Sequence, residues 1–160
     1  MADELVLVDT DVWSRVILGR RDQSAEVATW RRLLVGRQPV IAAQTEAELR
    51  FLPLVHRWEA ESAERFTAQV ERTPTAPVTP AVINAWAELR AACRARGHAL
   101  ADKVHQGNAW VAATALAYEL PLLTGAAIYR GVPELRLLEA LDEDQDGIGP
   151  PDRKGLLSPR

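Results

Sequence analysis

A short apolar run near the start of the chain, Leu5 to Val8, is followed at once by Asp9-Thr10-Asp11. Four apolar residues rich in strand formers are too few for a buried helix and are typical of a strand buried on both faces of a parallel sheet. Ligands of open α/β sheets bind at the carboxyl ends of the strands, where the outgoing loops form a crevice. We therefore expect the functional site to lie around Asp9.

Two further segments, Pro39–Ala42 and Pro121–Thr124, have the same short apolar character, and a fourth strand is predicted at Leu135–Leu138. Segments with helical spacing of apolar residues predict helices at 11–18, 24–35, from 45 onward, 54–70, 80–96, and 100–119 with an interruption at Gly107. The proline-rich stretch 73–80 is predicted to be a loop with a brief extended piece. Strands that alternate with helices predict an α/β protein, a three-layer α/β/α sandwich with a parallel sheet.

The composition is that of one soluble domain. The chain has 160 residues, 48% of them hydrophobic, and no apolar run near the roughly 18 to 20 residues that a membrane span needs. Acidic residues stand near the N-terminus where a secretory signal would carry positive charge, and the single cysteine, Cys93, fits a reducing compartment. We expect a cytoplasmic protein with its domain at residues 1–141 and a mobile tail, acidic and then rich in Gly and Pro, at 142–160.

Nearly all the cationic residues are arginines, although the net charge of the chain is −3. They cluster in the stretches 15–21, 31–37 and 90–96. The planar guanidinium group binds phosphate well, so an arginine-lined groove is compatible with RNA. The alternative is that these charges form solvated faces of helices, as charge runs commonly do.

Two acidic residues each have a structural and a functional interpretation. Asp9 is either the cap of the next helix or an oxygen ligand at the ligand-binding edge of the sheet. Glu48 belongs to the pattern Thr45-x-x-Glu48, which is typical of a capping box in which the Glu side chain bonds back to the Thr amide. Neither residue decides between the two interpretations by itself.

Four segments stand out when the chain is taken as a whole, in the order Leu7–Ser14, Thr45–Arg50, Asn108–Ala117 and Leu120–Thr124. Together they resemble the PIN-domain ribonucleases, specifically the VapC-type toxins of bacterial toxin–antitoxin pairs. The resemblance implies a PIN-like parallel sheet whose acids gather Mg²⁺ or Mn²⁺ for the hydrolysis of RNA, and hard cations of this kind do prefer carboxylate oxygens. It also implies a homodimer that is held inactive by a VapB-type antitoxin.

The resemblance carries the first two acids of the family onto Asp9 and Glu48, which become the expected catalytic and metal-binding residues. The third acid falls on Asn108, and the fourth falls where this chain has Ala126 or Ile128. Loss of two negative charges predicts weaker cation binding. Asn108 would supply one neutral oxygen in the third ligand position, or it caps the helix that follows it.

Three further residues are accessory candidates at this site. Asp11 and Asp102 are candidate replacement ligands, although Asp102 is also explained as a surface acid beside Lys103. Thr124 is either a hydroxyl that supports the ligands or the end of a strand before a Thr-Gly turn.

Three functions stay open from the sequence. The resemblance favours a metal-dependent endoribonuclease toxin, either naturally weakened or silenced by substitution at Asn108 and Ala126. A non-catalytic PIN scaffold that binds an antitoxin-like partner or RNA is the first alternative. The second alternative is a haloacid dehalogenase-like phosphatase, because an Asp-x-Asp pattern also follows a buried strand in that family. Two positions differ from it: Trp13 stands where that motif has Thr, and Lys103 precedes Thr124 rather than following it.

Overall fold

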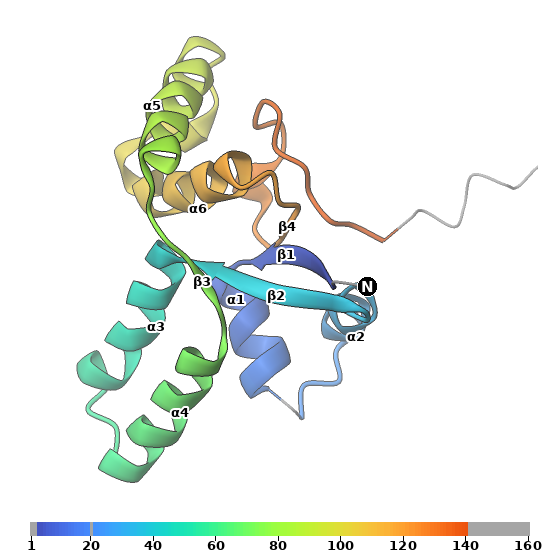
Figure 1. Cartoon of the computed structure of the whole chain (residues 1–160), viewed down its shortest axis with the longest axis vertical. Coiled ribbons are helices and arrows are strands. Elements are labelled where there is room, and N and C mark those ends of the chain that lie inside the picture. The colour runs from blue at the N-terminus through green and yellow to red at the C-terminus, as the bar shows by residue number, and fades with distance from the viewer. Residues whose placement is uncertain (1–2, 20, 141–160) are drawn as a thin grey trace, which may run out of the picture.

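The computed structural model describes residues 3–19 and 21–140, so the tail predicted at 142–160 lies outside the described residues. The centre of the molecule is a sheet of four parallel strands in the order β3-β2-β1-β4 (Figure 1). The strands are β1 (Glu4–Val8), β2 (Arg37–Ala42), β3 (Thr75–Ala76) and β4 (Leu122–Leu123). The parallel α/β sheet predicted from the sequence is therefore confirmed.

Helices cover both faces of this sheet, as Figure 1 shows for α5 and α6 on one side and for α3 and α4 on the other. The α-helices are α1 (Thr10–Trp13), α2 (Ala25–Leu33), α3 (Ala43–Val55), α4 (Ala60–Arg72), α5 (Pro80–Ala95) and α6 (Gln106–Ala117). Shorter elements are the π-helical η1 (Ser14–Leu18) and the 3-10 helices η2 (Ala99–Ala101), η3 (Lys103–His105) and η4 (Ala127–Tyr129). The two hydrophobic cores on either side of the sheet confirm the three-layer sandwich. Over the described ranges, no helix combines the length and the apolar character needed to cross a membrane.

Strand β1 is buried on both faces, as its apolar run predicts. Val6, Leu7 and Val8 are each at most 1% exposed. Leu7 packs in the core with α5 and α6, whereas Val6 and Val8 pack in the core with α1, α2, α3 and α4, because successive side chains of a strand point to opposite faces. Since β1 lies between β2 and β4, its carboxyl end is surrounded by the loops of both neighbours.

The prediction of one helix over 54–70 was wrong, because the chain forms two helices there. Helix α3 continues to Val55 before α4 begins. Arg57 has a φ of 49°, and the Trp58 amide donates to the Pro53 carbonyl at 3.1 Å, which together make a Schellman-type helix end. Glycine is the usual residue at such a left-handed position, so the sequence carried no stop signal at this point.

The fourth strand is also not where the apolar pattern predicted it. Leu135–Leu138 makes only an isolated bridge, between Leu137 and Leu122, whereas the brief extended piece predicted within 73–80 is the edge strand β3. A strand of two residues is too short to show any alternation, so the sequence predicted only an extended piece there and not a strand of the sheet. The interrupted helix predicted at 100–119 is instead η2 and η3 followed by α6, with Gly107 inside the first turn of α6.

A buried hydrogen bond joins α1 to the segment after α4: Trp13 Nε1 donates to Thr73 Oγ1 at 2.9 Å. In Thr73→Val the indole N–H keeps its burial but loses its acceptor, so we expect the free energy of unfolding to fall by about 1 to 3 kcal/mol. Urea unfolding followed by circular dichroism measures this change. Thr29→Val is the control, because Thr29 is half-exposed on α2 and its hydroxyl donates to the Ala25 carbonyl of the same helix; this variant should stay within about 0.5 kcal/mol of the wild type. Equal losses in the two variants would contradict the role of this hydrogen bond.

Candidate functional site

Asp9 lies directly after β1, at the carboxyl edge of the sheet, and is 8% exposed. It is the N-cap of α1, because its Oδ1 accepts the Thr10 amide at 2.9 Å. Its Oδ2 accepts the hydroxyl of Thr124, which follows β4, at 2.8 Å. The pairing of β1 with β4 thus brings together two residues that are 115 positions apart in the chain. Asp9 is at once a helix cap and a carboxylate at the predicted edge.

Glu48 reaches the same place from α3, which begins immediately after β2. Its Oε2 accepts the Thr10 hydroxyl at 2.7 Å, and its Oε1 accepts the Gln44 side-chain amide at 2.9 Å. Thr10 therefore bonds to both acids, to Asp9 through its backbone and to Glu48 through its side chain. The two acids that the sequence singled out lie on either side of one threonine.

The capping box predicted at Thr45-x-x-Glu48 is wrong. Helix α3 begins at Ala43, with Ala42 as its N-cap, so Thr45 lies inside the first turn. The Thr45 hydroxyl is buried and has no hydrogen-bond partner in the described part of the chain. Glu48 consequently bonds across to α1 instead of back to the start of its own helix.

Asn108 lies in the first turn of α6, and the N-cap of this helix is His105, so the alternative that Asn108 caps the helix is wrong. Asn108 Nδ2 lies 3.2 Å from His105 Nδ1, and Asn108 Oδ1 accepts the Tyr129 hydroxyl at 3.2 Å. Gly107 faces α3, and a methyl group there would lie 3.4 Å from Glu48 Oε1. The glycine lets the start of α6 approach α3, which brings the third predicted ligand position close to the second.

Tyr129 is the residue of this site that the sequence analysis missed. It lies in η4 with 1% of its surface exposed, and its hydroxyl donates to Asn108 Oδ1 at 3.2 Å. Burial raises the pKa of Tyr129, and the negative charge of Asp9 raises it further, so the hydroxyl keeps its proton and acts as a donor. The one signal in the sequence was its place in the segment where the resemblance expects a fourth acid.

Groups from several segments of the chain also determine the pKa of Asp9. Burial raises the pKa of Asp9, although the hydrogen bonds from the Thr10 amide and the Thr124 hydroxyl lower it. The negative charges of Asp11 and Glu48 raise it further, which shows that three carboxylates lie within electrostatic reach of one another. A positive charge at this edge of the sheet would relieve that repulsion.

The remaining predicted residues are divided between the site and its surroundings. Asp11 turns toward the loop after β4, where its Oδ2 accepts the Gly125 amide at 2.9 Å. Ala126 stands at the fourth acid position, and its amide donates to the Thr124 hydroxyl at 3.0 Å while its methyl group supplies no oxygen. Asp102 is exposed between η2 and η3, and within the described ranges its side chain makes no hydrogen bond to the site.

The chemistry of the donor set fits a hard divalent cation, because Asp9, Glu48 and Asn108 all offer oxygen. The charge and the arrangement of these residues are less favourable for binding a divalent cation. In residues 3–19 and 21–140, no group of three or more His, Cys, Asp or Glu residues is gathered so that it could hold a metal ion. All four carboxylate oxygens of Asp9 and Glu48 already accept hydrogen bonds from the protein. The residues therefore fit one weakly held cation rather than a tight metal centre.

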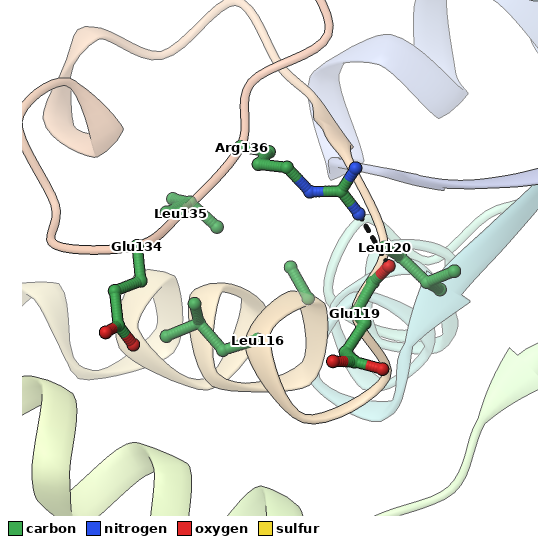
Figure 2. A pocket seen from close by; sticks show the side chains of 7 residues that line it. Leu116, Glu119, Leu120, Glu134, Leu135 and Arg136 are labelled. Carbon is green, nitrogen blue, oxygen red and sulfur yellow. Dashed lines mark hydrogen bonds between the residues drawn. The ribbon is translucent and has the colours of Figure 1, made fainter.

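Besides a small hollow of about 160 Å³ that is lined by Leu122, Thr124 and Ala126, two larger hollows lie along β4. One, of about 460 Å³, lies against Thr124 beside the candidate site and is also lined by Arg130 and Glu139, which form an ion pair at 3.0 Å. The other, of about 290 Å³, lies beyond the amino end of β4, where Arg136 donates to the Glu119 carbonyl at 2.7 Å (Figure 2). None of the candidate residues lines this second hollow, so the chemistry is assigned to the carboxyl edge of the sheet.

Several of the clustered arginines bind groups of the protein itself. Arg15 forms ion pairs with Asp22 at 3.1 Å and with Glu26 at 3.0 Å. Arg31 donates to the backbone carbonyls of Asp22 and Gly19 at 2.7 and 2.9 Å. These contacts hold the connection between η1 and α2, so the two guanidinium groups serve the fold rather than an open groove.

Comparison with protein families gives one match: the model of the PIN domain matches residues 6–133. No curated protein matches the chain. The described site lies inside the matched range, which contains Asp9, Glu48, Asn108 and Tyr129.

Solved structures of similar fold cover most of the chain. VapBC2 from Rickettsia felis, bound to a DNA fragment from its promoter, has 16% identity and a TM-score of 0.62 over 83% of this chain and 96% of that one. VapBC-1 from nontypeable Haemophilus influenzae has 16% identity and a TM-score of 0.65 over 84% and 97%. VapBC-5 from Mycobacterium tuberculosis, a member of the VapBC family of toxin-antitoxin systems, has 21% identity and a TM-score of 0.60 over 85% and 98%. At these identities the likeness is one of fold.

Because the pKa of Asp9 is raised, the contribution of Asp9 to the stability of the folded protein depends on pH in a defined direction. The folded state takes up a proton on Asp9 at higher pH than the unfolded state does, so the ionised carboxylate lowers stability at pH 7, and this loss disappears as the pH falls to about 4. We expect Asp9→Asn to have a higher Tm than the wild type at pH 7, with a gain that shrinks as the pH approaches about 4. Differential scanning calorimetry over this pH range measures it.

Asp102→Asn is the control for this prediction, because Asp102 is exposed and should show no such gain. A lower Tm for Asp9→Asn at pH 7 would mean that the hydrogen bonds to the carboxylate outweigh its burial.

Proposed function

This chain belongs to the PIN domain family, and from that premise we propose that it is the toxin component of a VapBC-type toxin–antitoxin pair, a cytoplasmic ribonuclease with weak hydrolytic activity. The observation that carries the proposal is the pair of acids held by Thr10. Asp9 and Glu48 come from β1 and α3, and they meet at the carboxyl edge of a parallel sheet, where the fold class places its ligands.

Each residue of the site has a distinct role in this proposal. Asp9 and Glu48 would hold a single Mg²⁺ or Mn²⁺ ion, and Asn108 would add a neutral oxygen. When bound, such an ion offsets the negative charge of the scissile phosphate and makes water a better nucleophile. The hydroxyls of Thr10 and Thr124 keep the two carboxylates oriented, because each donates to one of them.

The weakness of the proposed activity follows from the charge of the site. Two carboxylates stand where the family resemblance expects four, since the other positions carry Asn108 and Ala126. Affinity for a hard cation depends on the number of charged ligands, so the ion is held loosely.

A VapB-type antitoxin is the proposed protein partner, and the proposed assembly contains a homodimer of this chain. The VapBC structures of similar fold support the choice of partner. A further support is the apolar surface at the end of α3, where three large side chains are exposed: Phe51, Leu54 and Val55. Contiguous apolar side chains on a protein surface are typical of protein interfaces.

A non-catalytic PIN scaffold is the second candidate function, and one observation favours it. All the carboxylate oxygens of Asp9 and Glu48 are already hydrogen-bonded, so the site is complete without an ion. In that case the chain binds the antitoxin-like partner or RNA and does not hydrolyse RNA.

Cleavage of a mixed RNA substrate in Mg²⁺ or Mn²⁺ separates the two functions. We expect slow cleavage by the wild type, loss of cleavage in Asp9→Asn, and cleavage faster by about tenfold or more in a double variant that combines Asn108→Asp with Ala126→Asp. Glu61→Gln, at an exposed position of α4, is the control and should cleave as the wild type does.

Two results would change the conclusion. If the double variant cleaves and the unaltered chain does not, the chain as it stands is a non-catalytic scaffold on a nuclease fold. If no variant cleaves RNA and none binds the cation, the ribonuclease proposal is wrong.

A further inference from the structure

The Tyr129 hydroxyl occupies one position of the candidate cation site. It donates to Asn108 Oδ1 at 3.2 Å, and the negative charge of the Asp9 carboxylate acts on it. Asn108 holds the third ligand position and Asp9 the first, so the hydroxyl is bound to one of the oxygens that would face an ion and lies within electrostatic reach of another.

The surrounding structure fixes the tyrosine ring in this place. Tyr129 is 1% exposed and packs in the core with α5 and α6. The next residue is anchored by His98, whose Nε2 lies 2.7 Å from the Arg130 carbonyl while its Nδ1 accepts the Leu100 amide at 3.0 Å. The hydroxyl therefore cannot swing into solvent to make room for an ion without moving the ring and η4 together.

Packing alone does not require the hydroxyl. A phenylalanine ring would fill the same space in the core without introducing a polar group that needs a partner. Within the described residues the hydroxyl donates only to Asn108, which belongs to the site, so its role concerns the site.

We propose that the Tyr129 hydroxyl stands in for a cation at this site and competes with it, so that Tyr129 lowers the affinity of the protein for divalent metal ions. The inference rests on the proposed function. The hydroxyl already donates to Asn108 Oδ1, the oxygen that would join those of Asp9 and Glu48 around an ion. An ion that binds to this oxygen has to displace the tyrosine's donor, while Tyr129→Phe removes that competition.

Titration with Mn²⁺, followed by the electron paramagnetic resonance signal of the free ion, tests this proposal without relying on activity. We expect Tyr129→Phe to bind Mn²⁺ about tenfold more tightly than the wild type. Tyr118→Phe is the matched control, because the Tyr118 hydroxyl donates to the Pro77 carbonyl at 2.7 Å instead of to the site, and it should leave the affinity unchanged. Circular dichroism verifies that both variants are folded.

The same substitution is also made in the double variant with Asn108→Asp and Ala126→Asp, where a stronger site keeps the affinity measurable. There too Tyr129→Phe should bind Mn²⁺ about tenfold more tightly. Equal or weaker binding after Tyr129→Phe in this background would overturn the proposal, because the hydroxyl would then be neutral toward the ion or would help to hold it.

The titration also distinguishes this inference from the proposed function. If the double variant binds Mn²⁺ and cleaves RNA while Tyr129→Phe changes nothing, the inference alone fails. If the double variant binds no Mn²⁺ with either residue at position 129, the proposed metal-dependent ribonuclease fails and the inference fails with it.

Discussion

The structure has to accommodate one nearly buried carboxylate at the end of a strand that is covered on both faces. Asp9 meets this constraint with donors from two separate segments, the start of α1 and the loop after β4. Each donor depends on a different part of the fold, since Thr10 begins α1 and Thr124 requires β4 to lie beside β1. A buried charge without such partners would be strongly unfavourable, so the order of the strands and the environment of the site are linked.

Thr10 joins two layers of the molecule at this point. Its amide bonds to Asp9 and its hydroxyl to Glu48, so the end of β1 and the first turns of α3 are connected through one residue. Gly125 contributes by leaving space, because a methyl group there would lie 2.6 Å from Asp11 Oδ2. Short side chains thus set how closely the segments approach, and this closeness decides whether their oxygens can face a common ligand.

The features that follow from burial could be predicted from the sequence. An apolar run with acids at its end located both the central strand and Asp9, and parallel pairing explains why Thr124 lies beside that residue. The features that depend on local backbone conformation could not. Helix α3 ends through a left-handed Arg57 where glycine would be usual, and it starts two residues before Thr45, which removed the predicted capping box. Tyr129 was missed because a 3-10 turn, which has no hydrophobic period, carries it to the site.

The internal hydrogen bonds of Asp9 and Glu48 also affect how the protein matures. In small metalloproteins whose ligands are brought together by the ion itself, folding waits for the metal, and chelators unfold the chain. Here the carboxylates are matched by hydroxyl, amide and backbone donors of the same polypeptide. The fold therefore does not require an ion, and a cell starved of divalent metal would still present the same surface to whatever recognises this protein.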